Sequence, residues 1–428
     1  MGSPAPAAPA ILLRMSDRRP KVRCLEPSRD QGFLIYGFHG DNLPDDHPAK
    51  VLDSILGKLD LSQFTRDARA LEGERGRPVH SPKMMLTLWL YAISEGIGSA
   101  RAIARLVSTD AAFRWIVGDA KVSHQTLSEF RIGHAEAVDE LFTQVLSVLM
   151  HKGLLCLALV AQDGTRVRAS ASAPSFRREA SLEECREQAA LHLKAVRAAV
   201  EAGETAGAAV GAASDLARRV DEALEVVRSL RPRTKKNGEI VEPRASTTDP
   251  EARVMKMPDG GFRPGFNVQH AVAGDEHGGP RTVVAMQVTN LGSDLGSLVP
   301  MVNQIQQRTG VRPGALLADA GHATHDDLRT LEALGVRALV SVPKPSQRPG
   351  PHADHSPEIE RWRERMTLEE NIRLYRSRAG LVELVNAHFK SHHDLAGVLV
   401  RGLTKVTTVA LLTGIAFNLM QHAVGLMG

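Results

Sequence analysis

Apolar residues recur at helical spacing through the first third of the chain. Between residues 48 and 150 they fall every three or four positions, as at Ile55 and Leu59, which is the pattern of one buried helix face. Ser81 followed by Pro82 is typical of a helix start, because serine caps the first turn and proline fits its first position. We therefore predict an all-α domain over residues 48–150.

The last short helix of this region begins after Ser123 and carries polar residues on its first turns. Short helices joined by tight turns, ending in such a helix, are typical of a helix-turn-helix-like unit that reads DNA. The candidates for contact with bases or phosphates are His124, Gln125, Ser128 and Arg131. A plain helical bundle without nucleic-acid contact is the alternative.

The pattern changes after this region, where short apolar runs replace the helical spacing. Two of these runs, residues 154–163 and 315–319, end in aspartate, at Asp163 and Asp319. Runs of this length are typical of buried strands. Gly164 directly follows the first aspartate and predicts a hairpin turn at that point.

Further strands alternate with helices up to the C-terminal region. Strands are predicted at residues 165–169, 262–273, 281–289, 311–319 and 336–342, and helices at residues 294–309 and 326–334. This order predicts an α/β domain over residues 151–428, with a mixed sheet and helices on its faces.

Residues 178–230 interrupt the strand pattern. They are rich in Ala, Glu and Arg, and their apolar residues fall at helical spacing on both sides of a Gly- and Ala-rich centre at residues 202–213. We predict an antiparallel helical insertion in the α/β domain. It is a solvated arm, a contact to DNA or a contact to another protomer.

The composition is that of an ordinary soluble globular protein with two or three domains. The chain has 428 residues, of which 43% are hydrophobic and 24% charged, and its net charge is +4. Basic residues cluster in residues 1–30 and 228–244, where they either contact phosphate or belong to solvated loops. Aromatic residues make up only 4%, so stacking on bases is not the expected mode of nucleic-acid contact.

The ends of the chain and its cysteines indicate a cytoplasmic protein. Residues 1–47 read as an irregular basic segment without a secretory leader, and Met15 is a candidate start. The most apolar stretch, residues 406–420, is too short and too polar for a membrane span and predicts a buried core helix. The three cysteines are too widely spaced for a zinc motif and odd in number, which indicates a reducing compartment.

Three acidic residues carry the candidate chemistry. Asp163 and Asp319 each end a buried strand, where a charge is costly unless something there needs it. Glu383 lies in a basic, helix-prone stretch, seven residues before Lys390. Carboxylates gathered from such elements would bind Mg²⁺ while leaving room for water and phosphate. A pair of these ions is the usual machinery for breaking phosphodiester bonds.

At these residues the chain resembles the DDE transposases of bacterial insertion sequences. The matching pieces are AQDGTRVRAS around Asp163, STTDPEARVMK followed by FRPGFNVQHAV, LLADAGH around Asp319, and YRSRAGLVELVNAHFK from Tyr375 to Lys390. The last piece resembles the group with a Tyr-Arg-Glu-Lys signature. Four residues separate Arg378 from Glu383, where many relatives have three. The resemblance runs from about residue 48 to the C-terminus.

The resemblance implies a fold and a set of site residues. The fold is an RNase H-like catalytic domain with a helical insertion, preceded by the helix-turn-helix-like domain. Asp163, Asp319 and Glu383 would bind two Mg²⁺ ions, for which Mn²⁺ can substitute, and would carry catalysis. Tyr375, Arg378 and Lys390 would contact DNA.

The resemblance also implies a reaction and its partners. The protein would bind the terminal inverted repeats of its own element, cleave DNA there and transfer the freed strand into target DNA. Bringing two ends together implies a homo-oligomer, and no membrane is involved. Two alternatives remain: a catalytically silent DNA-binding protein derived from a transposase, and a metal-dependent nuclease that cuts without joining.

Overall fold

The computed structural model describes most of the chain after residue 42. The described residues are 24–25, 27, 32–33, 37–38, 43–68, 78–118, 120–203, 207–234, 237–342, 354–393 and 395–428. The basic segment predicted over residues 1–47 therefore lies largely outside them.

The first domain is helical, as the apolar spacing predicts. Its elements are α1 (Pro48–Leu56), the 3-10 turn η1 (Ser62–Thr65), α2 (Pro82–Ser94), α3 (Ala100–Thr109), α4 (Ala111–Val117), α5 (His124–Gly133) and α6 (Ala135–His151). Ser81 Oγ accepts from the N–H of Met84 and Ser123 Oγ accepts from the N–H of Thr126, so both predicted serines cap their helices. Four two-residue strands accompany these helices: β1 (Cys24–Leu25), β2 (Gly32–Phe33), β3 (Gly37–Phe38) and β4 (Val79–His80).

The second region is built on a mixed sheet. Its strands are β5 (Leu159–Arg168), β10 (Arg253–Lys256), β11 (Phe262–Ala273), β12 (Thr282–Thr289), β13 (Ala315–Ala318) and β14 (Arg337–Val340). The order is β10-β11-β5-β13-β14, and β12 pairs with the second half of β11. The pairs β5–β11, β11–β12 and β10–β11 are antiparallel, whereas β13 runs parallel to both β5 and β14.

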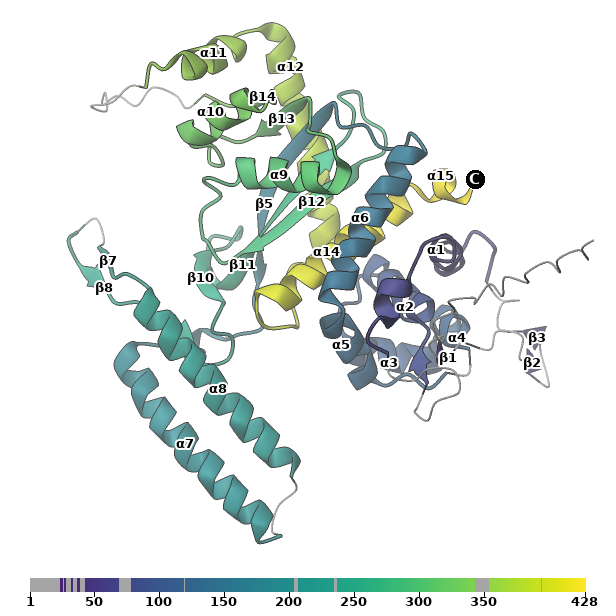
Figure 1. Cartoon of the computed structure of the whole chain (residues 1–428), viewed down its shortest axis with the longest axis vertical. Coiled ribbons are helices and arrows are strands. Elements are labelled where there is room, and N and C mark those ends of the chain that lie inside the picture. Colours follow the sequence, from purple (N-terminus) through teal and green to yellow (C-terminus); the bar gives the residue numbers. More distant parts are fainter. Residues whose placement is uncertain are drawn as a thin grey trace, which may run out of the picture.

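Helices surround this sheet (Figure 1). They are α9 (Leu298–Thr309), α10 (His325–Ala333), α11 (Pro357–Arg365), α12 (Glu369–Arg378), α13 (Leu384–Ser391) and α14 (Leu403–Gln421). The last helix, α15 (Ala423–Met427), packs against α1 of the helical domain. A π-helical turn, Ala379–Glu383, joins α12 to α13.

The hairpin predicted at Gly164 is wrong. β5 continues through Asp163 and Gly164 to Arg168, because it pairs residue by residue with β11 along this whole stretch. Gly164 serves close packing instead. A Cβ there would lie 2.2 Å from Gln269 Nε2 and 2.7 Å from Asp294 Oδ1.

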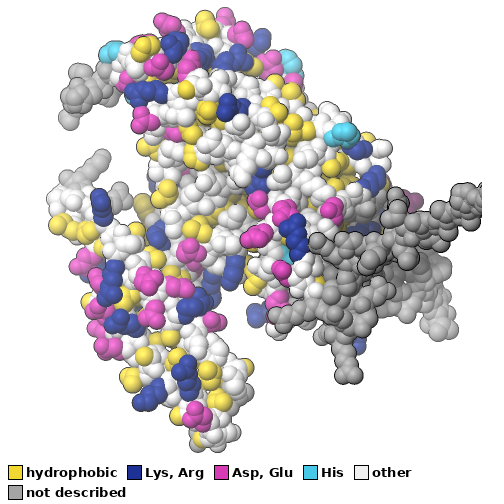
Figure 2. Space-filling model, viewed as in Figure 1, with side chains coloured by type: hydrophobic (Ala, Val, Ile, Leu, Met, Phe, Trp, Pro, Cys, Tyr) yellow, Lys and Arg dark blue, Asp and Glu magenta, His cyan; other side chains and the backbone are white. Residues whose placement is uncertain are grey.

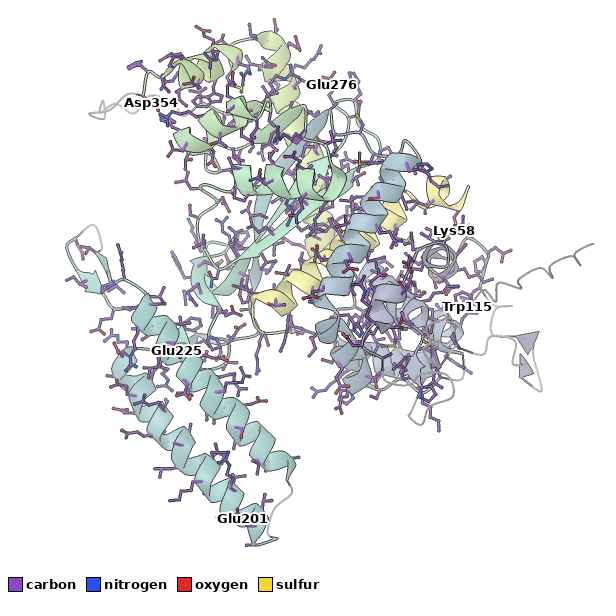
Figure 3. All side chains as sticks on the ribbon, viewed as in Figure 1. Lys58, Trp115, Glu201, Glu225, Glu276 and Asp354 are labelled. Carbon is purple, nitrogen blue, oxygen red and sulfur yellow. The ribbon has the colours of Figure 1, made fainter. Side chains whose placement is uncertain are left out.

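The predicted helical insertion forms a two-helix arm, α7 (Glu179–Glu201) and α8 (Ala208–Ser229), that extends away from the body (Figure 1). Glu201 lies at its far end (Figure 3). Basic and acidic side chains are interspersed over its visible face (Figure 2). The short elements η2 (Ala173–Ser175), β6 (Phe176–Arg177), β7 (Arg233–Thr234), β8 (Ile240–Val241) and β9 (Ala245–Ser246) flank the arm.

Helix α14 lies at the centre of the molecule and packs against α2, α6 and β12. Its length and composition would allow it to cross a membrane, but most of it is buried inside the molecule. It is the core helix that the sequence predicts. A smaller contact also joins the helical domain to the C-terminal end of the chain. Lys58, beside α1, donates from Nζ to the carbonyls of Leu426 and Met427 (Figure 3).

The contact between α14 and β12 generates a stability prediction. The ladder between β11 and β12 shifts register near Val283, and the buried Asn418 side chain bonds both backbone groups of that residue at 2.8 Å. We expect Asn418→Ala to lower the free energy of unfolding by about 2–4 kcal/mol, because two buried polar groups lose their partner. Urea unfolding followed by circular dichroism measures the change.

The matched control is Gln421→Ala, an exposed residue three positions further along α14. We expect this change to cost less than about 0.5 kcal/mol. Equal losses in the two variants would contradict the role given to Asn418.

Candidate active site

Two neighbouring strands bring the first two predicted acids to one edge of the sheet. β5 and β13 are parallel, and Ala161 pairs with Leu317. Asp163 and Asp319 each lie two residues beyond this pair, so both carboxylates reach the same place. Glu383 ends the π-helical turn and comes from the opposite side of the site.

The Arg378 guanidinium lies among the three carboxylates. Its Nη2 is 3.1 Å from Asp319 Oδ1 and 3.7 Å from Glu383 Oε1, and its Nη1 is 4.0 Å from Asp163 Oδ2. The Arg378 side chain is only 12% exposed, whereas that of Asp319 is 50% and that of Glu383 is 62% exposed. The three acids therefore surround a single positive charge, with two of them open to solvent.

Asp163 is the most firmly held of the three acids. Its Oδ2 accepts from Asn386 Nδ2 at 2.9 Å, and its Oδ1 accepts from the backbone N–H of Gly164 at 2.8 Å. His322 Nε2 lies 3.7 Å from the same Oδ1. Burial alone raises the pKa of Asp163, but the interactions with His322 and Gly164 outweigh it and hold the pKa below its usual value. The carboxylate is therefore charged and fixed in direction.

Tyr375 fixes the second acid, since its hydroxyl donates to Asp319 Oδ1 at 3.0 Å. Lys390 is close enough to Asp163 for the carboxylate to raise its pKa. Burial has the larger effect, and together with the charge of Arg166 it leaves the pKa of Lys390 below its usual value. The structure thus brings Tyr375, Arg378 and Lys390 to the three acids.

A buried histidine lies beside Asp163. His270 pairs with Asp163 across β5 and β11 and is fully buried. Burial lowers the pKa of His270 to about 4, although the charge of Asp163 opposes the shift. Neither ring nitrogen has a hydrogen-bond partner within the described part of the chain. The ring is therefore neutral at pH 7 and does not cancel the charge of Asp163.

Sequence reasoning missed the residues that orient the acids. His322 bonds Ser297 Oγ through Nδ1 at 3.0 Å, which directs its Nε2 toward Asp163. Asn386 reaches Asp163 from α13. The available signal was spacing, since His322 follows Asp319 by three residues and Asn386 follows Glu383 by three.

Asp294 also has a role that the sequence did not indicate. It precedes α9 and would be expected to cap it, but Ser297 takes the N-cap position. Asp294 instead accepts from Arg166 at 2.8 Å, Asn267 at 2.7 Å and Gln269 at 2.6 Å. These hydrogen bonds link β5 and β11 next to Gly164. The Asp294 carboxylate is thus already paired with Arg166.

The residues present suit a divalent cation. Among the described residues no three His, Cys, Asp or Glu side chains stand close enough to hold one ion as they are placed, because Arg378 lies between the acids. The guanidinium nevertheless marks a point that three carboxylates face together. Mg²⁺ prefers carboxylate oxygens, with further positions left to water and phosphate. Asp163, Asp319 and Glu383 would hold such ions once Arg378 moved aside.

The residues predicted on the recognition helix lie in α5, on the helical domain and away from the acids. His124 and Gln125 are exposed and Ser128 is half-buried. Arg131 is only 6% exposed. Its Nη1 donates to the Gly98 carbonyl at 2.9 Å, its guanidinium lies 4.3 Å from the centre of the Trp89 ring, and burial lowers its pKa to about 10. Arg131 therefore stabilises the domain and has no exposed charge to offer.

Asp249 is a buried cap and not a site residue. Its Oδ2 accepts from the backbone N–H of Gly402 at 3.3 Å, and Glu251 accepts from that of Leu403 at 2.9 Å. The two carboxylates thus cap the N-terminus of α14. Burial raises the pKa of Asp249 above its usual value.

The glycines that follow Asp163 and Asp319 in the sequence, Gly164 and Gly321, give a test of the site's packing. A Cβ at Gly164 would collide with Gln269 and Asp294, whereas a Cβ at Gly321 would meet open space. We expect Gly164→Ala to lower the free energy of unfolding by about 1–3 kcal/mol, because the hydrogen-bonded side chains of Gln269 and Asp294 must move apart to admit the new methyl group.

Gly321→Ala is the matched control, and we expect it to leave stability nearly unchanged. Thermal unfolding of both variants measures the difference. If Gly164→Ala unfolded at the same midpoint temperature as the wild type, the close approach of Gln269 and Asp294 to Gly164 would be contradicted.

Two family models match the chain. The model described as a transposase domain (DUF772) matches residues 38–132, and the model described as a transposase DDE domain matches residues 239–419. The second match contains Asp319 and Glu383, and Asp163 precedes it. Searches of the curated proteins and of the solved structures gave no match. The two matched domains, in this order, show that the chain is a DDE transposase of the insertion-sequence type.

Proposed function

We propose that this transposase binds the ends of its element, cleaves DNA there with the help of divalent metal ions, and joins the freed 3′ end to target DNA. The observation that carries the proposal is the meeting of Asp163, Asp319 and Glu383 around one cationic group at a sheet edge. Carboxylates in this arrangement are suited to phosphodiester chemistry.

Asp163 and Asp319 would hold one Mg²⁺ between them, and Asp163 and Glu383 would hold a second, with Mn²⁺ able to substitute. When bound, these ions would supply the activation of water or of a 3′-hydroxyl and the stabilisation of the leaving oxygen. The protein contributes orientation: Asn386 and His322 direct Asp163, and Tyr375 directs Asp319.

The basic residues of the site would hold the DNA backbone. Arg378 Nη2 lies near Asp319 and Glu383, whereas its Nη1 has no hydrogen-bond partner among the described residues, so a phosphate would give this nitrogen an anionic partner. Lys390 is half-buried beside Asp163, where it would meet a phosphate next to the scissile bond. Both roles agree with membership of the group that has the Tyr-Arg-Glu-Lys signature.

The fold we propose for the catalytic domain is RNase H-like. The order β12-β11-β5-β13-β14 supports this, because its first three strands are antiparallel neighbours and the last two run parallel to β5. Asp163 on the central strand and Asp319 after its parallel neighbour agree with that fold. The arm enters between β5 and β10, so it leaves this arrangement intact.

DNA ends would be read by the helical domain, through a helix-turn-helix-like unit that includes α5. His124 and Gln125 are exposed at the start of α5, where a recognition helix presents its side chains to DNA. Ser128 lies one turn further along the helix, and we leave the buried Arg131 out of this surface. The partners would be the terminal inverted repeats, target DNA and further copies of the protein.

The three acids give the principal test. Asp163→Asn, Asp319→Asn and Glu383→Gln should each lower cleavage and joining by at least ~10³-fold, because each removes a metal-binding charge. Binding to DNA that carries the ends should remain. The assay supplies Mg²⁺ or Mn²⁺ and follows nicked and joined products on labelled DNA.

Glu369→Gln is the control, because Glu369 is exposed at the start of α12 and lies outside the site. Normal cleavage by any of the three acid variants would refute the assignment. Nicking without joined product in the wild type would identify a nuclease. Binding without cleavage would identify a DNA-binding protein that has lost catalysis.

The start of α5 gives the second test. His124→Ala with Gln125→Ala should weaken binding to the element's ends about tenfold or more, because contacts with base edges are lost. Footprinting and gel shift measure this. The substitutions are preferable to removing residues 1–150, because α2 and α6 pack against α14 and their loss would expose it.

Ser147→Ala, on an exposed position of α6, is the matched control. An unchanged footprint in the double variant would remove α5 from the DNA-binding surface.

A further inference from the structure

Arg378 and Glu383 contact the same site although five positions separate them. A regular α-helix turns about 100° per residue, so it would place side chains five positions apart roughly 140° from each other. Yet Arg378 Nη2 lies 3.7 Å from Glu383 Oε1, and both face Asp163 and Asp319. The helix must therefore deviate from regular geometry between them.

The deviation is the π-helical turn, Ala379–Glu383. In a π-helix the backbone hydrogen bonds join residues five positions apart, so one turn contains an extra residue. Arg378 immediately precedes this turn and Glu383 ends it, which stacks the two residues one turn apart. The turn thus compensates for the additional residue in the chain's signature.

Contacts on both sides fix the turn in place. Leu381 and Val382 are buried, and a Cβ at Gly274 would lie 2.5 Å from Leu381 Cδ2, so the end of β11 leaves room for this side chain. Arg281 donates from Nε to the Gly380 carbonyl at 2.7 Å, which ties the turn to the start of β12.

We propose that this π-helical turn keeps the two halves of the signature helix in phase. It absorbs one residue so that Tyr375 and Arg378 before it face the same site as Glu383, Asn386 and Lys390 after it. The inference rests on the proposed function, because it takes Glu383 as the third acid. π-helical turns are rare and are frequently found at functional sites, which agrees with a role in catalysis.

Gly380 is the residue that can be removed. It is exposed, and a Cβ built on it would meet no atom within 4 Å. Deletion of Gly380 would convert the turn into a regular helical turn with Arg378 and Glu383 four positions apart. Both would still face the acids, because residues four apart share a helix face.

Deletion of Leu384 is the matched control. Leu384 is also exposed and directly follows the turn, so the chain loses one residue in each variant. The downstream helix would again stay in phase, held by its buried Val385 and Phe389. Val382, however, would move into the place of Glu383, and the carboxylate would point about 100° away.

The experiment compares wild type, Glu383→Gln and the two deletions, with folding checked by circular dichroism. We expect the Gly380 deletion to cleave and join DNA, and to bind Mn²⁺ in calorimetry, within about fivefold of wild type. We expect the Leu384 deletion to lose cleavage like Glu383→Gln and to bind Mn²⁺ more weakly. Adding Val382→Glu to the Leu384 deletion should restore part of the Mn²⁺ affinity and of the cleavage.

The outcomes separate the two ideas. Full cleavage by Glu383→Gln would overturn the third acid and this inference with it. An inactive Glu383→Gln beside a folded but inactive Gly380 deletion would overturn the phase-keeping role alone. An active Leu384 deletion, or a rescue variant that is folded but binds Mn²⁺ no better than its parent, would also overturn it.

Discussion

Burial of α14 is the constraint on which the rest of the structure depends. One helix fills the space between the helical domain and the sheet, with α2 and α6 on one side and β12 on the other. Asp249 and Glu251 cap its N-terminus. Near its other end, Asn418 bonds the backbone N–H and carbonyl of Val283, where the pairing of β11 and β12 is irregular. The two matched transposase domains therefore share a core, so the helices of the first domain and the acids are held in a fixed relation.

The site itself is organised by charge. Three carboxylates placed together repel one another, and each needs a compensating partner in a partly buried setting. Arg378 supplies it for all three, while Asn386, His322 and the Gly164 N–H supply it for Asp163 alone. His270 adds no charge because its burial keeps it neutral. The three carboxylates are therefore ordered around one shared positive charge. That charge lies at the end of the long arginine side chain of Arg378.

Several features could be predicted from the sequence because they depend on the spacing of residues that are close together in the chain. The helical spacing of residues 48–150, the apolar runs ending in Asp163 and Asp319, and the paired helices of the insertion all have such patterns. Tyr375, Arg378 and Lys390, which the resemblance singled out, lie close to the acids, and their contact with DNA stays a prediction.

The failures share a cause, which is that tertiary contacts decided them. Gly164 looked like a turn, but nine pairs with β11 keep β5 extended through it. Arg131 looked like a DNA contact, but Trp89 and the Gly98 carbonyl lie where its side chain reaches. Asp294 precedes α9, where an acid often caps a helix, but Arg166 and two amides from β11 bind it. None of these partners is near in sequence, so no local pattern could reveal them.

The place where the arm joins the body has a consequence for the history of this chain. β6 and β9 pair with each other, Phe176 opposite Ser246, so the chain leaves and returns at one point. Closing a loop costs little more entropy when the loop grows longer, and here the two ends are already clamped. Evolution can therefore lengthen, shorten or replace the segment beyond this clamp while Asp163 and its neighbours keep their positions.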